Sequence, residues 1–273
     1  MSGRRALITG ASSGIGAATA RLAAQRGYRV ALLARRVGAL NELLAELPPV
    51  PEGKHLALAC DLCDPWAVCS AFERCERDFG GGLDLLVNNA GVGYRARVSE
   101  LDDDLLRRVI DTNVTGLFTC CREAFPLLCK GDKPVVVNVS SVVGRRGVPT
   151  QAAYAATKAA VCSLGEALRL EWAEDGIQVC TLDPGLTATG FFEAQPNPSG
   201  LPDPSLEGSQ SALEVAASIL ALDEQPRPEL FLRPKWRWLG VLSLLAPRLA
   251  DRIVARRIVG ELPPRSQSED ENS

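Results

Sequence analysis

Short apolar segments alternate along the chain with longer segments in which apolar residues recur every three or four positions. The short segments are rich in Val, Leu and Ile and are apolar almost throughout, which is typical of strands buried on both faces of a parallel sheet. They are Ala6–Thr9, Val30–Ala34, Leu56–Cys60, Leu83–Asn88, Val135–Ser140 and Val179–Asp183. Helical periodicity covers Ile15–Arg26, Val37–Leu47, Pro65–Phe79, Asp102–Cys129 and Gln151–Glu174. This alternation predicts an α/β fold, a Rossmann-type doubly wound parallel sheet in a three-layer αβα sandwich.

The chain is predicted to form a single domain over residues 1–262, because it contains no repeat and no Ser/Gly-rich linker. Within it, Gln195–Ser209 holds four prolines and two glycines and is predicted to be a long loop. Residues 234–262 form an apolar and basic extension. Residues 263–273 are polar and acidic, so we expect a disordered tail there.

Composition and charge narrow the function classes. The 273 residues carry a net charge of −3, which gives no overall attraction to nucleic acid. The only histidine, His55, excludes a Ser-His-Asp triad, and nine cysteines without zinc-ribbon spacing lead us to expect no metal. No apolar stretch of signal-peptide length precedes the first predicted strand, and the apolar run Leu239–Ala246 has eight residues against about 18 needed to span a bilayer. We therefore expect a cytoplasmic protein.

A glycine-rich loop joins the first predicted strand to the first predicted helix. It comprises Gly10, Ala11, Ser12, Ser13, Gly14, Ile15 and Gly16. Glycines permit a tight turn and let the backbone approach a pyrophosphate, and the helix N-terminus supplies amide donors. This placement predicts a dinucleotide site, whereas the same glycines elsewhere would indicate only a turn.

The end of the second predicted strand bears on the choice of cofactor. In this type of fold an acid at that position binds the ribose of NAD, whereas an arginine accommodates the extra phosphate of NADP. The strand ends at Ala34 and is followed by Arg35 and Arg36, with no acid. We therefore predict that NADP(H) is preferred over NAD(H). The alternative is that Arg36 only faces solvent.

Candidate catalytic residues follow the fifth predicted strand. Tyr154 and Lys158 are four residues apart and share one face of a predicted helix. A tyrosine with an ordinary pKa of about 10 needs a nearby cation to act as acid or base near neutral pH. By itself, such a pair also fits a half-buried ring beside a solvated amine. However, Ser140 and Ser141 end the strand before this helix, at the carboxyl edge where doubly wound sheets bind ligands.

Together these motifs resemble the short-chain dehydrogenase/reductase family, in the branch with a TGxxxGxG loop and a YxxxK pair. The resemblance covers about residues 4–233. It is carried by Thr9–Gly16, Asp61-Leu62, Asn88–Gly91, Asn113, Ser140-Ser141, Tyr154-x-x-x-Lys158 and Pro184-Gly185, in the order and spacing of that family. It implies an NADP(H)-dependent carbonyl reductase or alcohol dehydrogenase.

The resemblance also implies a role for each matching residue. Ser141 corresponds to the serine that hydrogen-bonds the substrate oxygen, with Ser140 as the alternative, and Tyr154 corresponds to the general acid or base. Lys158 corresponds to the residue that binds the nicotinamide ribose and lowers the tyrosine pKa, and Asn113 to the residue that holds a water in the proton relay. The other implied cofactor contacts are the loop residues Gly10, Ser12, Ser13, Gly14, Ile15 and Gly16, Asp61 and Leu62 at the adenine, Asn89, Ala90 and Gly91 beneath the cofactor, and Pro184, Gly185, Thr187 and Thr189 at the nicotinamide.

The substrate is less readable from the sequence. We expect the pocket to include Val143, Gly144, Tyr94 and the stretch Thr189–Gln210 with Phe191 and Phe192, which would favour a small apolar carbonyl or alcohol. The physiological substrate and the direction of the reaction stay open. Two alternatives also stay open: a non-catalytic regulator that binds NADPH, and an epimerase or dehydratase with the same fold.

Two surfaces suggest partners. In relatives, the apolar faces of helices corresponding to Asp102–Cys129 and Gln151–Glu174 form subunit contacts, so a homodimer or homotetramer is expected. A second surface lies after the seventh predicted strand, near Glu229–Arg233, where aromatic and apolar residues precede a basic helix that begins at Pro247 and can end at Gly260. The 234–260 segment suits peripheral membrane contact or a flap over the substrate groove, with packing on the protein or across a dimer as the simpler interpretation.

Overall fold

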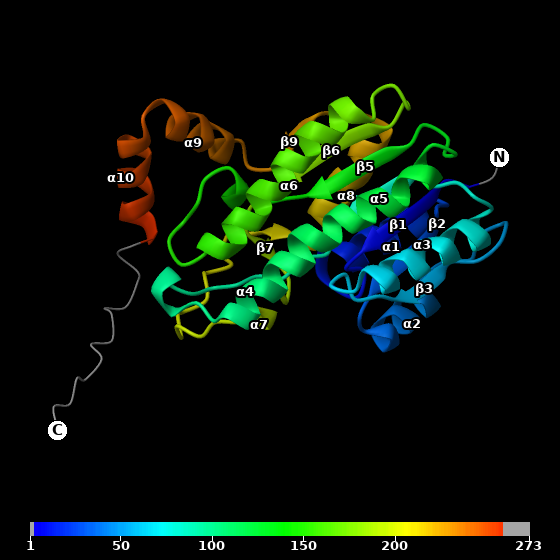
Figure 1. The fold of residues 1–273 in the computed structure, drawn as a ribbon, viewed down its shortest axis with the longest axis horizontal. Coiled ribbons are helices and arrows are strands. Elements are labelled where there is room, and N and C mark those ends of the chain that lie inside the picture. The colour runs from blue at the N-terminus through cyan, green and yellow to red at the C-terminus, as the bar shows by residue number, and fades with distance from the viewer. Residues whose placement is uncertain (1–2, 259–273) are drawn as a thin grey trace.

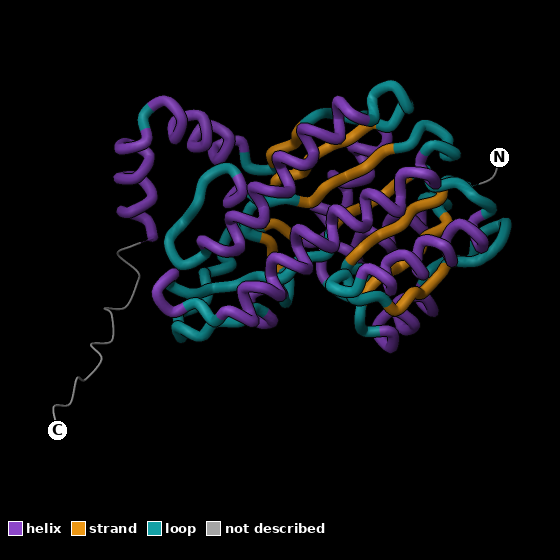
Figure 2. The backbone as a smooth tube through the Cα atoms, in the orientation of Figure 1, coloured by secondary structure: helices purple, strands orange, loops and turns teal. Residues whose placement is uncertain are grey.

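The computed structural model describes residues 3–258 and is built around one parallel sheet of seven strands (Figures 1 and 2). The strand order is β3-β2-β1-β4-β5-β6-β9, which confirms the predicted doubly wound Rossmann-type fold. The strands are β1 (Arg5–Thr9), β2 (Arg29–Ala34), β3 (Leu56–Ala59), β4 (Leu85–Asn88), β5 (Val135–Val139), β6 (Gln178–Asp183) and β9 (Glu229–Phe231). A separate two-stranded sheet pairs β7 (Thr187–Ala188) with β8 (Gln210–Ser211). The predicted end of the last helix at Gly260 and the predicted tail 263–273 lie outside the described residues.

Two layers of helices cover the sheet, and each layer has its own core. One core packs the sheet against α3 (Pro65–Phe79), α5 (Gly116–Leu128) and α6 (Ala152–Glu171). The other packs it against α1 (Gly14–Gln25), α2 (Val37–Glu46) and α8 (Ala212–Glu224). Central strands are buried on both faces, which explains their continuous apolar sequence. The remaining helices are α4 (Asp103–Ile110), α7 (Phe191–Ala194), α9 (Pro234–Leu245) and α10 (Pro247–Ile258).

One predicted helix differs from the structure. The segment Asp102–Cys129 was expected to be a single helix, but it consists of α4, a π-helical segment at Asp111–Thr115, and α5. A π turn adds one residue to the helix, and this one is mostly polar in sequence. Val114 nevertheless keeps the three- to four-residue spacing of apolar positions between Ile110 and Leu117, so the sequence pattern does not show the break.

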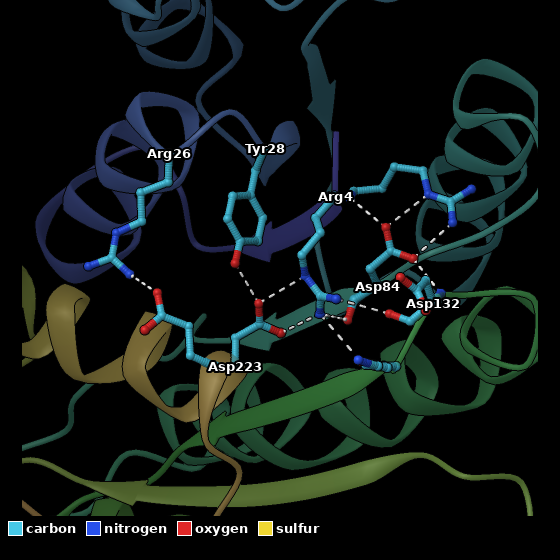
Figure 3. Close-up of polar contacts among 9 residues, drawn as sticks. Arg4, Arg26, Tyr28, Asp84, Asp132 and Asp223 are labelled. Carbon is cyan, nitrogen blue, oxygen red and sulfur yellow. Dashed lines mark hydrogen bonds and ion pairs between the residues drawn. The ribbon is translucent and has the colours of Figure 1, made fainter. Parts of the chain in front are cut away.

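Ion pairs between partly exposed arginines and buried carboxylates fix the amino edge of the sheet (Figure 3). The Asp84 carboxylate accepts hydrogen bonds from the Arg5 backbone N–H at 2.7 Å and from its guanidinium at 2.8 and 3.0 Å. Asp223 on α8 accepts hydrogen bonds from Arg4 at 2.7 Å and from the Tyr28 hydroxyl at 2.6 Å. These contacts tie β1 to its neighbours at the edge opposite the glycine-rich loop. The glycine-rich loop and the other connections that follow the strands lie at the carboxyl edge, away from these contacts.

The chain order of the strands predicts where a ligand binds. From β1 the chain proceeds to β2 and β3 on one side of the sheet, and then to β4, β5 and β6 on the other side. Doubly wound sheets bind ligands at the carboxyl edge where this reversal occurs. The loops that follow β1 and β4 therefore form the centre of the candidate site.

Candidate active site

The glycine-rich loop lies directly against the chain that follows β4. Gly10 has φ +67° and Gly14 has φ +54°, a region that disfavours other residues. A Cβ on Gly10 would lie 2.8 Å from the Ala90 Cα, and a Cβ on Gly16 would overlap the Gly10 carbonyl. Asn89 locks this approach, since its side-chain amide donates to the Thr9 carbonyl at 2.9 Å. The glycines are therefore required by close backbone packing.

The start of α1 is suited to an anionic group. Ser13 precedes this helix in an extended conformation, and the described structure shows no capping hydrogen bond from its side chain. The first backbone N–H groups of a helix lack partners within the helix and attract phosphate. Ser12, Ser13 and Ile15 thus stand where the loop backbone and α1 can hold a pyrophosphate.

Arg36 reaches this loop from the end of β2. Its guanidinium lies 3.1 Å from the Ser12 hydroxyl oxygen, and both Arg35 and Arg36 are exposed. The structure therefore places at least one of the two predicted arginines beside the glycine-rich loop.

Asp61 and Leu62 follow β3 and have different environments. Leu62 is buried and packs against Gly116 at the start of α5, where a Cβ would come within 2.7 Å of the Leu62 Cβ. Asp61 is partly exposed, accepts from the Cys63 N–H at 3.1 Å, and lies 3.7 Å from Arg108 on α4. The sequence analysis missed Arg108, since only the folded chain brings α4 beside the end of β3.

Tyr154 and Lys158 lie on one face of α6, as their spacing predicts. Lys158 is 4% exposed, and its Nζ donates to the Val139 carbonyl at 2.8 Å and lies 5.8 Å from the centre of the Tyr154 ring. Ser141, which follows β5, interacts with the Tyr154 hydroxyl. The structure thus brings the hydroxyl, phenol and ammonium groups together.

Burial shifts the pKa values of both groups on α6. Removal from water destabilises a charged ammonium, which lowers the pKa of Lys158 to about 8. Removal from water also destabilises a phenolate and raises the pKa of Tyr154, while the hydrogen bond with Ser141 opposes this rise. The pKa of Lys158 falls while that of Tyr154 rises. The phenol is therefore neutral near neutral pH and carries a proton that it can donate.

Asn113 lies in the π-helical segment and connects α4–α5 to the site. Its side-chain amide donates to the Val92 carbonyl at 2.9 Å and to the Thr157 hydroxyl at 3.0 Å, and its Oδ1 accepts from the Val92 N–H at 2.8 Å. A Cβ on Gly91 would lie 3.4 Å from both the Asn113 Oδ1 and the Lys158 Nζ. Gly91 therefore lies against Asn113 and Lys158 together.

The chain after β6 folds back towards the glycine-rich loop. The Gly185 N–H, next to Pro184, donates to the Gln210 side chain at 2.8 Å, and the Thr187 hydroxyl donates to the Gly185 carbonyl at 3.1 Å. A Cβ on Gly14 would lie 3.3 Å from the Thr189 side chain. This segment thus contacts the glycine-rich loop. Gln210 ends the stretch predicted to line the pocket, but its hydrogen bond to Gly185 was not predicted.

Aromatic side chains adjoin the phenol of Tyr154. The Phe191 ring lies 5.4 Å from the Tyr154 ring and 5.4 Å from the Phe192 ring, centre to centre. Val143 is half-buried in the short helical turn after Ser141, with Gly144 packed against the Lys158 backbone. These side chains give the site an apolar wall.

Tyr94 does not fit the predicted pocket. It is 1% exposed and packs with Ala96 and Val109, and its hydroxyl accepts from the Asp102 N–H at 2.7 Å. The expectation that Tyr94 contacts substrate is therefore corrected to a structural role beneath α4. A tyrosine beside the expected pocket gives no signal in the sequence of which way its ring points.

A charged cluster behind the site was also missed. The Asp183 side chain is fully buried, next to Pro184, and its Oδ2 lies 3.5 Å from the Arg145 guanidinium. Arg145 also contacts Glu166 at 3.2 Å and Glu229 at 2.9 Å. Burial raises the pKa of Asp183 to about 6, and Arg145 opposes that rise. Residues from the turn after β5 and from α6, β6 and β9 meet here, so their proximity cannot be predicted without the strand order.

Comparison with known proteins agrees with this geometry. A family model described as short chain dehydrogenase matches residues 4–199. The chain belongs to the short-chain dehydrogenase family. It is 33% identical to dehydrogenase/reductase SDR family member 7B of Bos taurus, over 92% of this chain and 80% of that protein. The match identifies an oxidoreductase family whose fold binds nicotinamide cofactors.

Solved structures of this family share the fold. An alcohol dehydrogenase from Thermococcus sibiricus, complexed with 5-hydroxy-NADP, superposes with a TM-score of 0.73 at 29% identity, over 84% of this chain and 96% of that one. A 3-ketoacyl-(acyl-carrier-protein) reductase from Brucella melitensis, complexed with NADH, superposes with a TM-score of 0.75 at 27% identity, over 84% of this chain and 96% of that one.

Two further observations concern metals and membranes. Within residues 3–258, His, Cys, Asp and Glu side chains form no group of three or more that could hold a metal ion. Over the same residues, none of the helices combines the length and apolar character that crossing a bilayer requires.

Proposed function

We propose that this short-chain dehydrogenase interconverts a carbonyl and an alcohol on an apolar substrate, with NADP(H) as cofactor and Tyr154 as the general acid or base. The observation that carries the proposal is the grouping of Ser141, Tyr154 and Lys158 beside the glycine-rich loop. Electrostatic preorganisation of this kind is a major source of rate enhancement in enzymes.

The residues present fit a dinucleotide. Glycine at 10 and 16 lets the loop fold closely on itself and on the chain after β4, in the tight turn that a pyrophosphate requires, and the start of α1 adds backbone N–H groups. Arg36 beside Ser12 supplies a cation that suits the additional phosphate of NADP(H). Asp61, Asn89 and the Pro184–Thr189 segment would hold the remaining parts. When bound, the nicotinamide supplies or accepts a hydride.

The protein's own side chains would manage the proton. In reduction, Tyr154 donates its phenolic proton to the substrate oxygen as negative charge develops there, and Ser141 donates a hydrogen bond to the same oxygen. In oxidation, Tyr154 takes the proton back. The Lys158 ammonium stabilises the tyrosinate between these steps, and Asn113 fixes the backbone around Val92 beside it. Phe191 and Phe192 would restrict water and favour apolar substrates.

The catalytic assignment is tested with two tyrosine variants. Tyr154→Phe should lower the rate of NADPH oxidation by at least 100-fold over a panel of ketones and aldehydes graded by size, while NADPH still binds. Tyr28→Phe removes a phenol at the opposite edge of the sheet and should leave turnover at the wild-type level. Near-normal carbonyl reduction by Tyr154→Phe would overturn the proposal.

The cofactor preference is tested separately by titrating NADPH and NADH. Arg36→Gln should weaken NADPH binding about 10- to 100-fold, the loss expected for a hydrogen bond between charged groups, and leave NADH binding nearly unchanged. Arg35→Gln, at a neighbouring position that is also exposed, is measured in the same way to show which of the two arginines contributes to NADPH binding. Equal affinity of the wild-type protein for both cofactors contradicts the preference.

Subunit association is proposed through α4, α5 and α6. Ile110, Phe118 and Leu170 are exposed apolar residues on this layer, at 42%, 51% and 78%. An exposed apolar face is typical of an interface between copies. Sedimentation velocity should give a dimer or tetramer, and Phe118→Gln should shift it towards smaller species. A wild-type monomer at micromolar concentration would exclude this association.

A further inference from the structure

The last two described helices form a pair on the site side of the molecule. Figure 1 shows α9 and α10 beyond β9, at the end of the fold towards which β5 points. Gly240 of α9 packs against Arg145, and Asp251 of α10 forms an ion pair with Arg146. Ala250 and Val254 of α10 are buried, so this helix turns one face inward. The pair is therefore attached to the domain by one face, and its other face is free to contact a partner.

The outer face of this pair exposes large apolar side chains. Trp238 is 71% exposed, Leu244 84% and Leu245 80%. The exposed apolar residues of the pair are Trp238, Val241, Leu244, Leu245, Leu249 and Ile253. Apart from the adjacent pair Leu244 and Leu245, these residues follow one another at intervals of three or four positions from α9 into α10. Contiguous exposed apolar residues of this kind mark an interaction surface.

Cations are interspersed with these apolar residues. Residues 234–256 contain five Lys and Arg residues and a single acidic residue, Asp251. The cations are Lys235, Arg237, Arg248, Arg252 and Arg256, and all five are exposed. The whole chain, in contrast, carries a net charge of −3. Positive charge is therefore concentrated beside the apolar surface.

The combination of exposed apolar side chains and cations indicates which kind of partner this face can bind. A second copy of the same face would bring like charges together across a two-fold axis, which costs free energy. Each helix has 12 residues, too few to cross a bilayer of about 30 Å. A helix with apolar residues and Lys or Arg on its exposed side instead lies in the interface of a membrane with anionic lipids.

We propose that the outer face of the α9–α10 pair binds the surface of a bilayer that contains anionic lipids. Trp238, Leu244 and Leu245 enter the boundary between headgroups and acyl chains, and the cations lie among the phosphates. The contact is peripheral and depends on both lipid charge and apolar burial.

The test measures flotation of the full-length protein with vesicles of phosphatidylcholine alone and with about one third phosphatidylserine. Wild-type protein should float with the anionic vesicles and at least tenfold less with phosphatidylcholine alone. Trp238→Gln/Leu244→Gln should lose at least tenfold in binding, because both side chains would otherwise be buried in lipid. The matched control is Trp66→Gln/Leu213→Gln, which removes one exposed Trp and one exposed Leu elsewhere and should bind as wild type.

Charge is tested with a second variant. Arg248→Gln/Arg252→Gln should lose about fivefold in binding for each cation removed, and wild-type binding should weaken as salt rises. Absence of wild-type binding, equal binding to both vesicles, or an equal loss in the matched control would each overturn the proposal. So would conversion of an oligomer to a monomer by Trp238→Gln/Leu244→Gln in sedimentation velocity, since it would assign the face to a second copy.

Discussion

Arg145 is the cation that faces the buried Asp183 carboxylate, and its removal should destabilise the fold in a manner that depends on pH. The two groups lie 3.5 Å apart, and the Asp183 side chain is completely buried. Arg145→Met keeps most of the side-chain length and removes the charge. Because a buried carboxylate without a partner is costly, Asp183 must then bind a proton or remain charged at high free energy.

The magnitude follows from the pKa of Asp183. Burial raises this pKa from 3.8 to about 6 in the folded protein. A folded-state pKa above the unfolded value means that the contribution to stability is complete below about pH 4 and is lost as pH rises through about 6. Arg145→Met raises the pKa further. Each unit by which Arg145→Met raises this pKa above 6 makes the loss of unfolding free energy at pH 8 exceed the loss at pH 5 by about 1.4 kcal/mol.

Urea unfolding at pH 5 and pH 8, followed by far-ultraviolet circular dichroism, measures this difference. The control is Arg74→Met, which breaks an exposed pair with Asp78 on α3 and should cost less than about 1 kcal/mol at both pH values. Arg145→Met/Asp183→Asn should abolish the pH dependence. An equal loss for Arg145→Met at pH 5 and pH 8, or a pH dependence that survives in the double variant, refutes the reasoning.

Two further predictions concern the glycine-rich loop and the amino edge. Gly16→Ala places a Cβ against the Gly10 carbonyl and should weaken NADPH binding at least tenfold in a fluorescence titration. Gly38→Ala adds a Cβ that meets no other atom within 4 Å and should leave NADPH binding unchanged. Equal affinities of the two variants for NADPH would contradict the packing argument. Tyr28→Phe removes a hydrogen bond of 2.6 Å to Asp223 and should lower the unfolding free energy by about 1–3 kcal/mol in urea, and no change would show that this bond is not stabilising.

The sequence predicted the sheet because its signal is strong and local. Strands buried on both faces are apolar almost throughout, and the order of strands and helices along the chain indicates right-handed crossovers. The helix at 102–129 was wrong in one respect, because the π-helical segment Asp111–Thr115 preserves apolar periodicity while shifting the helix by one residue. A local pattern does not record that shift.

The candidate site was predicted as far as its motifs are contiguous. The glycine-rich loop and the Tyr154–Lys158 pair are each encoded in a few neighbouring residues, and the structure brings them to one edge. Arg108 beside Asp61, and Gln210 beside Gly185, come from distant parts of the chain and lack such a signal. The buried ring of Tyr94 shows the converse limit, because proximity in sequence to the site did not determine its direction.

Burial of Tyr154 and Lys158 has two opposing effects on the acid–base role proposed for Tyr154. Burial raises the pKa of Tyr154 and would by itself prevent the formation of tyrosinate. The same burial strengthens the attraction between a Tyr154 phenolate and the Lys158 ammonium. Two unit charges separated by the 5.8 Å between the Nζ and the ring centre attract by about 3 kcal/mol at an effective dielectric constant of 20, against less than about 1 kcal/mol in water. With a pKa of about 8, Lys158 is still protonated at neutral pH and retains this charge. In the proposed mechanism, the dry site therefore makes the phenol a weak acid, and the neighbouring ammonium lowers the free energy of the tyrosinate that forms when the proton leaves.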